Sequence, residues 1–472
     1  MTTVPDSVAS RGRVHIVLVP GFGAFDALGQ IEYYAGTTER YQRWLNDRGS
    51  PHRGVVLDYF DNLPTAGVST RATWLHTYLA KRIARGEIQD DDTIALVGHS
   101  TGGLDIRRML FSPVDPPADL VLDGGGATDG SDATAVRVKH EEILKKVSRV
   151  VFISVPQYGT NIADWVRGHA FLRRAVIEGL YRGVQGAGIP PLEKGISLLL
   201  DEVAKLTKQP DILKAAQDAL NETKTSGTDP VHLADAEQAG SQLRLWLQHM
   251  DHDFGVIDDL ASFTDPPPDS TSPAHYSESA RQAEKDLWRD HDIATCSIAT
   301  IGRRAFTFDP RQRAKPFELH NTSTWPTKKR ESDAAEMDIS YVLTYRACAG
   351  GPFTVPSSVA EPAGDIDTLN LSLLDVTKLG TAGPTSGEGL AVWDNDGIVN
   401  TASMLWPNLE LTRLVAADHL DVVGHYVLRE TVPSPDASGR RYASVDALKS
   451  HTEFTQDAFD HVWKEVFDFC VS

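Results

Sequence analysis

Three residue types that can together perform nucleophilic catalysis occur in the chain in the order Ser, Asp, His. Ser100 is the centre of GHSTG, Asp396 lies in DNDGIVN and His419 lies in AADHLDVVG. A serine hydroxyl is a weak nucleophile at neutral pH, so it needs a base to take its proton and an acid to orient that base. Together they would attack a carbonyl carbon and form an acyl-enzyme. Because GxSxG also occurs by chance, the flanking sequence must decide.

The residues around Ser100 are typical of a strand–turn–helix junction. TIALVG at 93–98 predicts a buried strand, and LDIRRMLF at 104–111 predicts the start of a helix. A nucleophile elbow is so sharp that the residues two before and two after the serine must be very small. Gly98 and Gly102 meet this requirement. We therefore interpret Ser100 as a nucleophile, and the alternative is an ordinary packed Gly-Ser turn.

The acid and the base each have a second candidate. Asp394 lies two residues before Asp396, but at the predicted end of a strand rather than in the Asp-Gly turn. His425 lies six residues after His419, within the helical pattern that follows. Loops that follow parallel strands form the active edge of such a sheet. We therefore expect Asp396 and His419 to fill the two roles.

An acyl-transfer site must also stabilise the oxyanion that forms on the attacked carbonyl, and two backbone N–H groups do this in many enzymes. The residue after the nucleophile, Thr101, is the first expected donor. The second is Phe22, in the glycine-rich segment PGFG that follows an early strand. The alternative for PGFG is a plain β-turn.

Alternating strand and helix patterns predict a doubly wound α/β sheet to position these residues. The predicted strands lie at 13–19, 55–60, 93–98, 149–155, 295–302, 338–347, 389–394 and 411–417. The predicted helices lie at 71–86, 104–111, 140–147 and 446–469.

The pattern divides the chain into three parts. Residues 1–160 form the first part of the α/β core, with the glycine-rich loop and the elbow. Residues 161–275 are almost wholly helical in pattern and predict a cap or lid inserted at the edge where substrates enter. Residues 276–472 complete the core with the acid and histidine loops. Apolar residues of the insertion could line an acyl pocket, or they could simply pack its helices together.

Composition excludes several classes of function. Apolar residues make up 41% of the 472 residues, as in ordinary globular proteins. The net charge of −19 argues against nucleic acid and against anionic membrane surfaces. There is no apolar run long enough to span a membrane and no visible secretory signal, so we expect a cytoplasmic protein, or a secreted one if a signal has been removed. The cysteines at 296, 348 and 470 are expected to be free thiols.

Five blocks of the sequence, covering about half of the chain, resemble the true lipases of bacteria, which have the α/β-hydrolase fold. This resemblance implies hydrolysis of carboxylic esters, often long-chain acylglycerols, through an acyl-enzyme and without a cofactor for the chemistry. It implies Ser100, Asp396 and His419 as the triad, with Phe22 and Thr101 as oxyanion donors. The blocks are VLVPGFGAFDALGQIEYYAG, GHSTGG, ISVPQYGTNIADW, DNDGIVNTASM and DHLDVVG.

The resemblance also implies a structural Ca²⁺ ion that holds the histidine loop. Its side-chain ligands in the family are an aspartate about twenty residues before the triad acid and an acidic residue two after the triad histidine. Asp375 lies 21 residues before Asp396, and Asp421 lies two residues after His419. Hard carboxylate oxygens suit Ca²⁺. The alternative is a helix N-cap for Asp421 and a turn for Asp375.

The sequence also departs from the family. Pro20 stands where the family usually has histidine, the 113–137 loop is an insertion, and the helical segment after Asn161 is longer than a typical lid. The same triad would serve an acyltransferase, a lactonase or an amidase, and a hydrolase fold can also act as a non-catalytic binding module. The complete Ser/Asp/His set argues against the binding module. We expect a small-molecule or lipid ester as substrate, and the sequence does not specify the oligomeric state.

Overall fold

A parallel sheet forms the centre of the computed structural model. Its strands are β1 (Val14–Val19), β4 (Val55–Tyr59), β5 (Thr93–His99), β6 (Val147–Ile153), β7 (Ala294–Ile301) and β10 (Thr412–Ala416). The structure describes residues 12–23, 27–28, 31–47, 54–63, 66–111, 140–168, 255–261, 269–302, 339–350, 368–369, 390–391, 394–407, 412–426, 448, 450, 452 and 454–472.

The strand order in this sheet is β10-β7-β6-β5-β1-β4, and every neighbouring pair is parallel. The chain therefore moves outward from β1 to β4 and then returns to the other side of β1. This reversal places a topological switch point between β1 and β5, where the loops that follow these two strands diverge. Ligand sites of open α/β sheets lie at the carboxyl ends of the strands at such a point.

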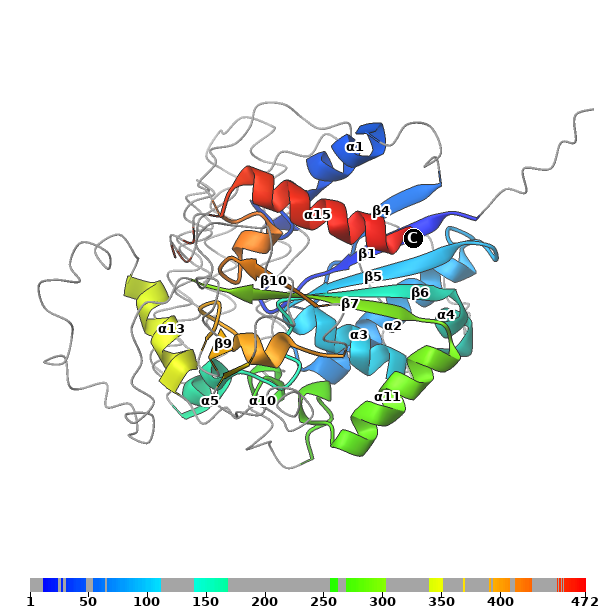
Figure 1. The fold of residues 1–472 in the computed structure, drawn as a ribbon. Helices are drawn as coiled ribbons and strands as arrows, with labels where there is room; N and C mark the ends of the chain where they lie inside the picture. The colour runs from blue at the N-terminus through cyan, green and yellow to red at the C-terminus, as the bar shows by residue number, and fades with distance from the viewer. Residues whose placement is uncertain are drawn as a thin grey trace, which may run out of the picture.

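Helices cover both faces of the sheet, as Figure 1 shows. Alternate residues of β1 serve the two cores: Val17 and Val19 belong to one, and Ile16 and Leu18 to the other. The first core includes residues of α2 (Val68–Ala84), α3 (Thr101–Phe111), α4 (His140–Lys146) and α11 (Glu278–Asp290). The second includes residues of α1 (Thr37–Asp47) and α15 (Gln456–Cys470). A mostly parallel sheet flanked by helices in this way is the α/β-hydrolase fold predicted from the sequence.

Shorter elements complete the described part of the chain. The helix α5 (Asn161–Gly168) contacts both α13 (Ile339–Gly350) and α10 (Val256–Asp259). The remaining helical elements are η2 (Pro273–His275), η6 (Thr401–Met404) and η8 (Asp421–Val423). Two small antiparallel pairs are formed by β2 (Ala27–Leu28) with β3 (Ile31–Glu32) and by β8 (Thr368–Leu369) with β9 (Leu390–Ala391).

Most of the predicted cap lies outside the described residues. Of 161–275 the structure describes 161–168, 255–261 and 269–275, so the apolar residues between Phe171 and Leu200 are not among them. The predicted 113–137 loop is also outside the described residues. The three-part division of the chain therefore stays a prediction.

The strand predicted at 338–347 is wrong, because residues 339–347 belong to the helix α13. Branched and aromatic residues in this segment favour a strand by composition. The burial pattern instead follows a helix: Tyr341, Tyr345, Cys348 and Ala349 are all almost fully buried. Spacings of four and then three or four residues place them on one helical face, and packing of that face outweighs the local preference.

The strand predicted at 389–394 is also different in the structure. Of its described residues, Leu390 and Ala391 are in strand and Asp394 is not, and the two strand residues pair with β8 rather than joining the parallel sheet. The closing helix predicted at 446–469 begins later, at Gln456. It begins there because the Thr455 hydroxyl accepts a hydrogen bond from the Ala458 N–H and caps the helix.

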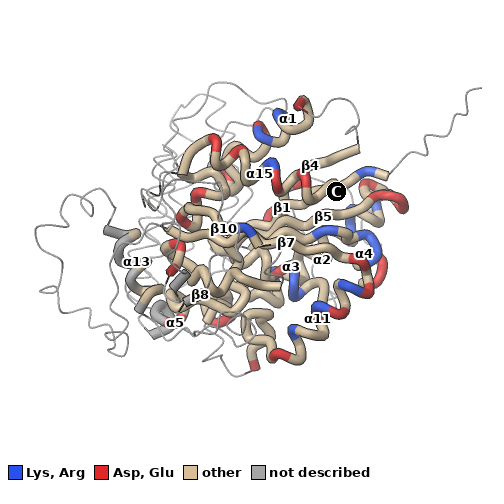
Figure 2. The backbone as a smooth tube through the Cα atoms, in the orientation of Figure 1, with Lys and Arg blue, Asp and Glu red and all other residues tan. Residues whose placement is uncertain are grey.

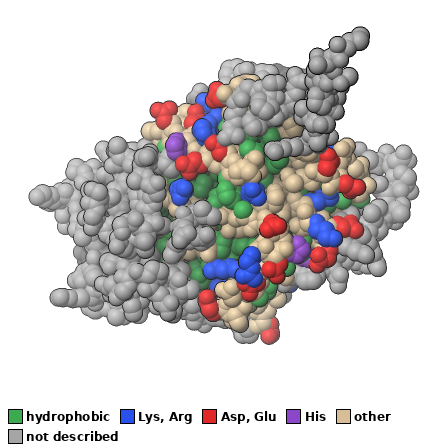
Figure 3. Space-filling model, turned by 45° about the vertical axis from the view of Figure 1, so that its right-hand side comes forward, with side chains coloured by type: hydrophobic (Ala, Val, Ile, Leu, Met, Phe, Trp, Pro, Cys, Tyr) green, Lys and Arg blue, Asp and Glu red, His purple; other side chains and the backbone are tan. Residues whose placement is uncertain are grey.

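Charged side chains lie mainly on the helices and at the strand ends. Figure 2 shows basic and acidic residues side by side along α4 and α11, whereas the middle of the sheet is largely uncharged. The face shown in Figure 3 likewise has both signs of charge intermixed with hydrophobic side chains. Among the described helices, none is long and apolar enough to cross a membrane. The three cysteines are free thiols, as predicted.

Candidate active site

Ser100 lies in a strained turn between β5, which ends at His99, and α3, which begins at Thr101. Its φ angle is 53°, in the left-handed region that residues other than glycine rarely adopt. The Ser100 N–H donates to the Ile153 carbonyl at 2.9 Å, at the end of the neighbouring strand β6. The side chain is therefore held at the carboxyl edge of the sheet, next to the positive end of a helix dipole.

The two glycines that flank Ser100 are required by close backbone contacts. A Cβ atom on Gly98 would lie 2.6 Å from the Gly103 nitrogen, and a Cβ on Gly102 would lie 2.2 Å from the Val19 carbonyl oxygen. Neither contact is sterically tolerable. The turn at GHSTG is thus the sharp elbow that the sequence predicted, with β1 packed directly against it.

The PGFG segment lies beside Ser100. Val19 of β1 is paired with Gly98 of β5, so the residues that follow these two strands lie next to each other. A Cβ atom on Gly21 would lie only 2.6 Å from the Ser100 Cβ. Phe22 follows Gly21 in a turn and packs on the first core. This loop is a turn, as the alternative interpretation had it, but its place next to Ser100 is the one that an oxyanion loop requires.

Thr101 occupies the first position of α3 and is fully buried. The first N–H groups of a helix have no partner within the helix, so they are directed out of its N-terminal end. This end adjoins Ser100. The predicted donors Phe22 and Thr101 therefore belong to two segments that both border the serine.

A single buried guanidinium connects these two segments. Arg71 of α2 donates from Nη2 to the Pro20 carbonyl at 2.9 Å and to the Thr101 hydroxyl at 3.1 Å. Its Nη1 donates to the Leu63 carbonyl at 2.7 Å. Arg71 is completely buried. The planar fork of arginine suits such a bridge, because its N–H groups point in fixed directions.

The charge of Arg71 is balanced by Asp105 of α3, which is also completely buried. The Arg71 Nη2 and Asp105 Oδ2 atoms are 2.8 Å apart, and the Asn62 amide donates to Asp105 at 2.9 Å. Burial raises the pKa of Asp105, while the attraction of Arg71 opposes that rise. This ion pair joins α2 to α3 beneath the elbow.

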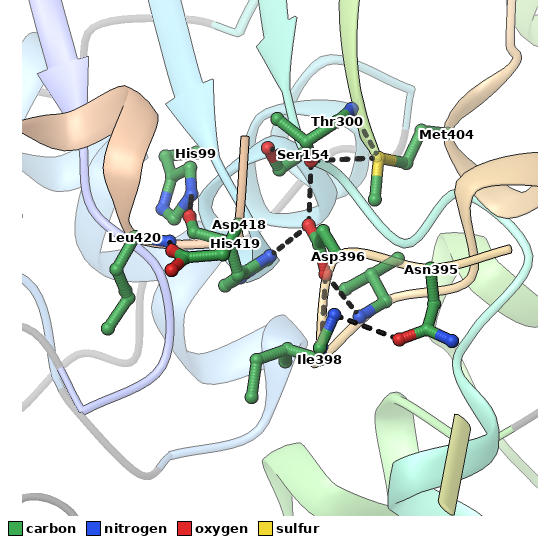
Figure 4. A network of polar contacts seen from close by, with 12 residues as sticks. His99, Ser154, Thr300, Asn395, Asp396, Ile398, Met404, Asp418, His419 and Leu420 are labelled. Carbon is green, nitrogen blue, oxygen red and sulfur yellow. Dashed lines mark hydrogen bonds and ion pairs between the residues drawn. The ribbon is translucent and has the colours of Figure 1, made fainter. Parts of the chain in front are cut away.

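Asp396 reaches the same edge of the sheet by docking on the end of β7. The Gly302 N–H donates to the Asn395 carbonyl at 2.9 Å, and the Thr300 hydroxyl donates to Asp396 Oδ2 at 2.7 Å. Ser154, at the end of β6, contacts the Thr300 hydroxyl at 2.8 Å. Figure 4 shows this line of polar groups. The acidic residue therefore depends on β7 for its position, although it lies far along the chain from that strand.

The Asp396 carboxylate accepts four hydrogen bonds. Oδ1 accepts from the backbone N–H groups of Ile398 at 3.0 Å and Val399 at 2.8 Å, across the Asp-Gly turn. Oδ2 accepts from Thr300 and from His419 Nδ1, the latter at 2.7 Å. The His419 N–H also donates to the Asp396 carbonyl at 3.0 Å. Asp396 thus fixes both the ring and the backbone of His419.

This contact sets the proton on the His419 ring. A carboxylate can only accept, so we assign the hydrogen to Nδ1, and Nε2 is then the proton acceptor in the neutral ring. His419 is almost fully buried, and its ring lies 4.7 Å from that of His99, the residue before Ser100. The His419 imidazole therefore lies beside the residue that precedes Ser100, with its Nε2 turned away from Asp396.

The second candidates from the sequence take other places. Asp394 is buried, and its carbonyl accepts from the Thr401 N–H at 2.8 Å, but it is Asp396 that contacts His419. The His425 Nε2 pairs with the Tyr33 carbonyl at 3.1 Å. Burial lowers the pKa of His425 to about 4. The geometry therefore favours Asp396 and His419 over both alternatives.

Asp421 belongs to a hydrogen-bonded loop directly after His419. Its Oδ2 accepts from the Asp418 N–H at 2.8 Å and from the Thr452 hydroxyl at 2.6 Å, and it does not cap η8. The Asp418 carboxylate accepts from Ser450 at 2.5 Å. No group of three or more His, Cys, Asp or Glu suited to a metal occurs among the described residues, and Asp375 lies outside them. Carboxylates that ligate metals are commonly hydrogen-bonded as well, so the Asp421 geometry is compatible with a calcium ligand without requiring one.

The sequence analysis missed several residues that position the site. Arg71 carries a usable signal: it lies four residues before Leu75 in the helical pattern, so a charged residue stands on an otherwise apolar stripe. His99 and Thr300 carry no such signal, because a histidine in an elbow and a threonine in a strand are ordinary. Their partners become apparent only when the strands are placed side by side.

Comparisons with known proteins give structural neighbours only. No protein-family model matches the chain, and no curated protein sequence matches it. Its structural neighbours include a metagenomic carboxyl esterase, with 12% identity, a TM-score of 0.37, and coverage of 100% of this chain and 79% of that one. They also include the Staphylococcus hyicus lipase, with 12% identity, a TM-score of 0.36 and coverage of 98% and 99%. Lipase 1 from Pelosinus fermentans has 15% identity, a TM-score of 0.34 and coverage of 88% and 94%.

Proposed function

We propose that this protein is a carboxylic ester hydrolase in which Ser100 is the nucleophile, His419 the general base and Asp396 the orienting acid. The observation that carries the proposal is the 2.7 Å contact between His419 Nδ1 and Asp396 Oδ2 at the edge of the sheet where Ser100 occupies a strained elbow. Buried acid–histidine pairs are common, but a neighbouring serine in a left-handed turn is an uncommon addition.

The proposed reaction has two halves. In the first, His419 Nε2 takes the proton of the Ser100 hydroxyl as its oxygen attacks the ester carbonyl, and the oxyanion is stabilised by the N–H groups of Thr101 and Phe22. His419 then gives this proton to the leaving alkoxide, and the acyl group stays on Ser100. In the second half, water loses a proton to His419, attacks the acyl-enzyme and releases the acid as the proton returns to Ser100.

We propose an apolar acyl or aromatic ester, either a small molecule or a lipid, as the substrate. The support for this class is the sequence resemblance and the apolar residues of the insertion, between Phe171 and Leu200. A panel of esters with short, long and aromatic acyl groups tests the class. Addition of a competing alcohol separates hydrolysis from acyl transfer, because a transferase would form the new ester in place of the free acid.

Active-site labelling with a fluorophosphonate tests the assignment of Ser100. We expect the wild-type protein to be labelled and the Ser100→Ala variant to resist labelling and to lose about 10⁴-fold or more of its esterase activity. Ser148→Ala is a matched control, because Ser148 lies in β6 toward the strand's opposite end. An unlabelled wild-type protein, or a labelled Ser100→Ala variant, would refute the proposal.

We also propose that Asp375 and Asp421 contribute ligands to a structural Ca²⁺ ion, which would fasten the loop after His419. The support is their spacing in the sequence and the hard carboxylate chemistry. Chelation is then expected to lower the melting temperature of the wild-type protein and to leave that of Asp375→Asn unchanged. Equal melting temperatures of the wild-type protein with and without chelator would contradict the calcium site.

A further inference from the structure

A partly buried series of hydrogen bonds connects the loop before Phe22 to the backbone of His419. The Gly21 N–H donates to the Tyr33 hydroxyl at 3.0 Å. The same hydroxyl lies 2.6 Å from His99 Nδ1, and His99 Nε2 lies 2.9 Å from the His419 carbonyl oxygen. This series of hydrogen bonds therefore passes through His99, the residue that precedes Ser100. Figure 4 shows His99 beside His419.

Chemistry fixes the direction of every hydrogen bond in this series. The His419 carbonyl can only accept, so His99 Nε2 carries a hydrogen. Burial, together with the neighbouring His419 ring, lowers the pKa of His99 well below its usual range, so the ring is neutral and its Nδ1 is an acceptor. Burial also raises the pKa of Tyr33, which keeps its proton and donates it to Nδ1. The Tyr33 oxygen is then an acceptor for Gly21.

Tyr33 is itself held from a second direction. Its carbonyl accepts from His425 at 3.1 Å, and its ring packs edge-on against Tyr34 with centroids 5.1 Å apart. His425 lies six residues after His419 in the same loop. Both the hydroxyl and the backbone of Tyr33 are therefore tied to the segment that carries His419, one through His99 and the other directly.

We propose that Tyr33 and His99 are positioning residues that fix the distance between the oxyanion loop and the catalytic base. The proposal rests on the proposed function, since it takes Phe22 as an oxyanion donor and His419 as the base. Gly21 immediately precedes Phe22, so a displaced Gly21 would displace that donor. Errors of about 1 Å in such a site can cost about 100-fold in rate.

Tyr33→Phe tests the proposal, because it removes one oxygen atom and keeps the ring. We expect kcat for a soluble ester to fall about 10- to 100-fold while KM changes less than about threefold, since alignment affects the transition state more than substrate binding. Tyr41→Phe is the matched control. The Tyr41 hydroxyl likewise donates one hydrogen bond, to the Val55 carbonyl at 2.8 Å, but at the far end of the sheet. We expect kcat of this control to be unchanged.

Two substitutions of His99 test its two hydrogen bonds separately. The Asn side chain of His99→Asn reaches only to the position of Nδ1 and preserves an acceptor for Tyr33. The longer His99→Gln side chain preserves a donor to His419. We expect both substitutions to lower kcat. When Tyr33→Phe is added to His99→Gln, we expect the logarithm of kcat to fall by less than half as much as it does when Tyr33→Phe is made in the wild-type protein, because the acceptor of the Tyr33 hydroxyl is already absent.

The outcomes separate the two levels of the argument. If the wild-type protein hydrolyses esters and labels at Ser100 but Tyr33→Phe retains its kcat, the positioning role is wrong and the proposed function stands. Additive effects of Tyr33→Phe and His99→Gln would also overturn this series of hydrogen bonds. A wild-type protein that neither hydrolyses esters nor labels would overturn both. If Tyr33→Phe does not fold, the His99→Asn variant gives the same decision through its kcat.

Discussion

Replacement of Arg71 by methionine tests whether one buried residue supports both the stability of the fold and the geometry of the site. Arg71 and Asp105 are both completely buried, so the substitution leaves a carboxylate in the core without its counter-charge. Breaking a buried ion pair in this way typically costs about 3–5 kcal/mol. It also removes the donors to the Pro20 carbonyl and the Thr101 hydroxyl, on the two sides of the proposed oxyanion hole. Arg71→Met should therefore lose both stability and activity.

The double variant Arg71→Met with Asp105→Leu distinguishes these two losses. Replacing both members of a buried pair by apolar residues of similar size is often neutral for stability or stabilising. We therefore expect the free energy of unfolding, measured with urea, to return to within about 1–2 kcal/mol of the wild-type value. We expect kcat for a soluble ester to stay about 10- to 100-fold low, because the loop and the elbow are no longer bridged. Recovery of both quantities would refute the positioning role, and a single variant of wild-type stability would refute the buried-charge argument.

The stability loss of Arg71→Met also has a predictable dependence on pH. Burial raises the pKa of Asp105, and Arg71 opposes this rise, so its removal should raise that pKa further. A carboxyl group with a raised folded-state pKa favours folding when protonated, and this contribution is lost as the pH rises through that value. The deficit relative to wild type should therefore be larger at about pH 8 than at about pH 5. Unfolding curves at the two pH values measure it.

Two further predictions concern the elbow and the acid. Gly98→Ala should destabilise the fold by about 1–3 kcal/mol and slow the labelling of Ser100, because the new methyl group meets the backbone of Gly103. Thermal unfolding and labelling rates measure the two effects. A variant with wild-type stability and a wild-type labelling rate would contradict the close contact. Asp396→Asn should lower kcat about 10⁴-fold by reversing the His419 tautomer, whereas Asp394→Asn should retain most activity; a larger loss in Asp394→Asn would exchange the two assignments.

The elbow could be predicted from sequence because its constraints are local. The backbone that Gly98 contacts belongs to Gly103, five residues later, so this constraint lies within one short segment. The contact of Gly102 with Val19 comes from the neighbouring strand β1, but the GxSxG pattern already records the need for a small residue there. The turn position of Asp396 could be predicted for a related reason. Two of the four hydrogen bonds to its carboxylate come from the Asp-Gly turn, from residues within three positions of it. Short-range geometry of this kind leaves a readable pattern.

The long-range supports of the site could not be predicted in the same way. Thr300 reaches Asp396 because the segment carrying Asp396 docks on the end of β7, and neither segment encodes this contact alone. The error at 338–347 has a similar origin, because contacts of α13 with α5 and with the turn near Gly397 outweigh the strand preference of its residues. Tertiary neighbours decided both cases.

The docking of Asn395 on Gly302 also has a consequence for how this scaffold can vary. The two residues are joined by a backbone hydrogen bond of 2.9 Å, although about ninety positions separate them in the chain. The two ends of the intervening segment are therefore held together by this hydrogen bond. The closure entropy of a loop grows only slowly with its length. Insertions or deletions between Gly302 and Asn395 are therefore expected to leave the Asp396 carboxylate in place as long as this hydrogen bond forms.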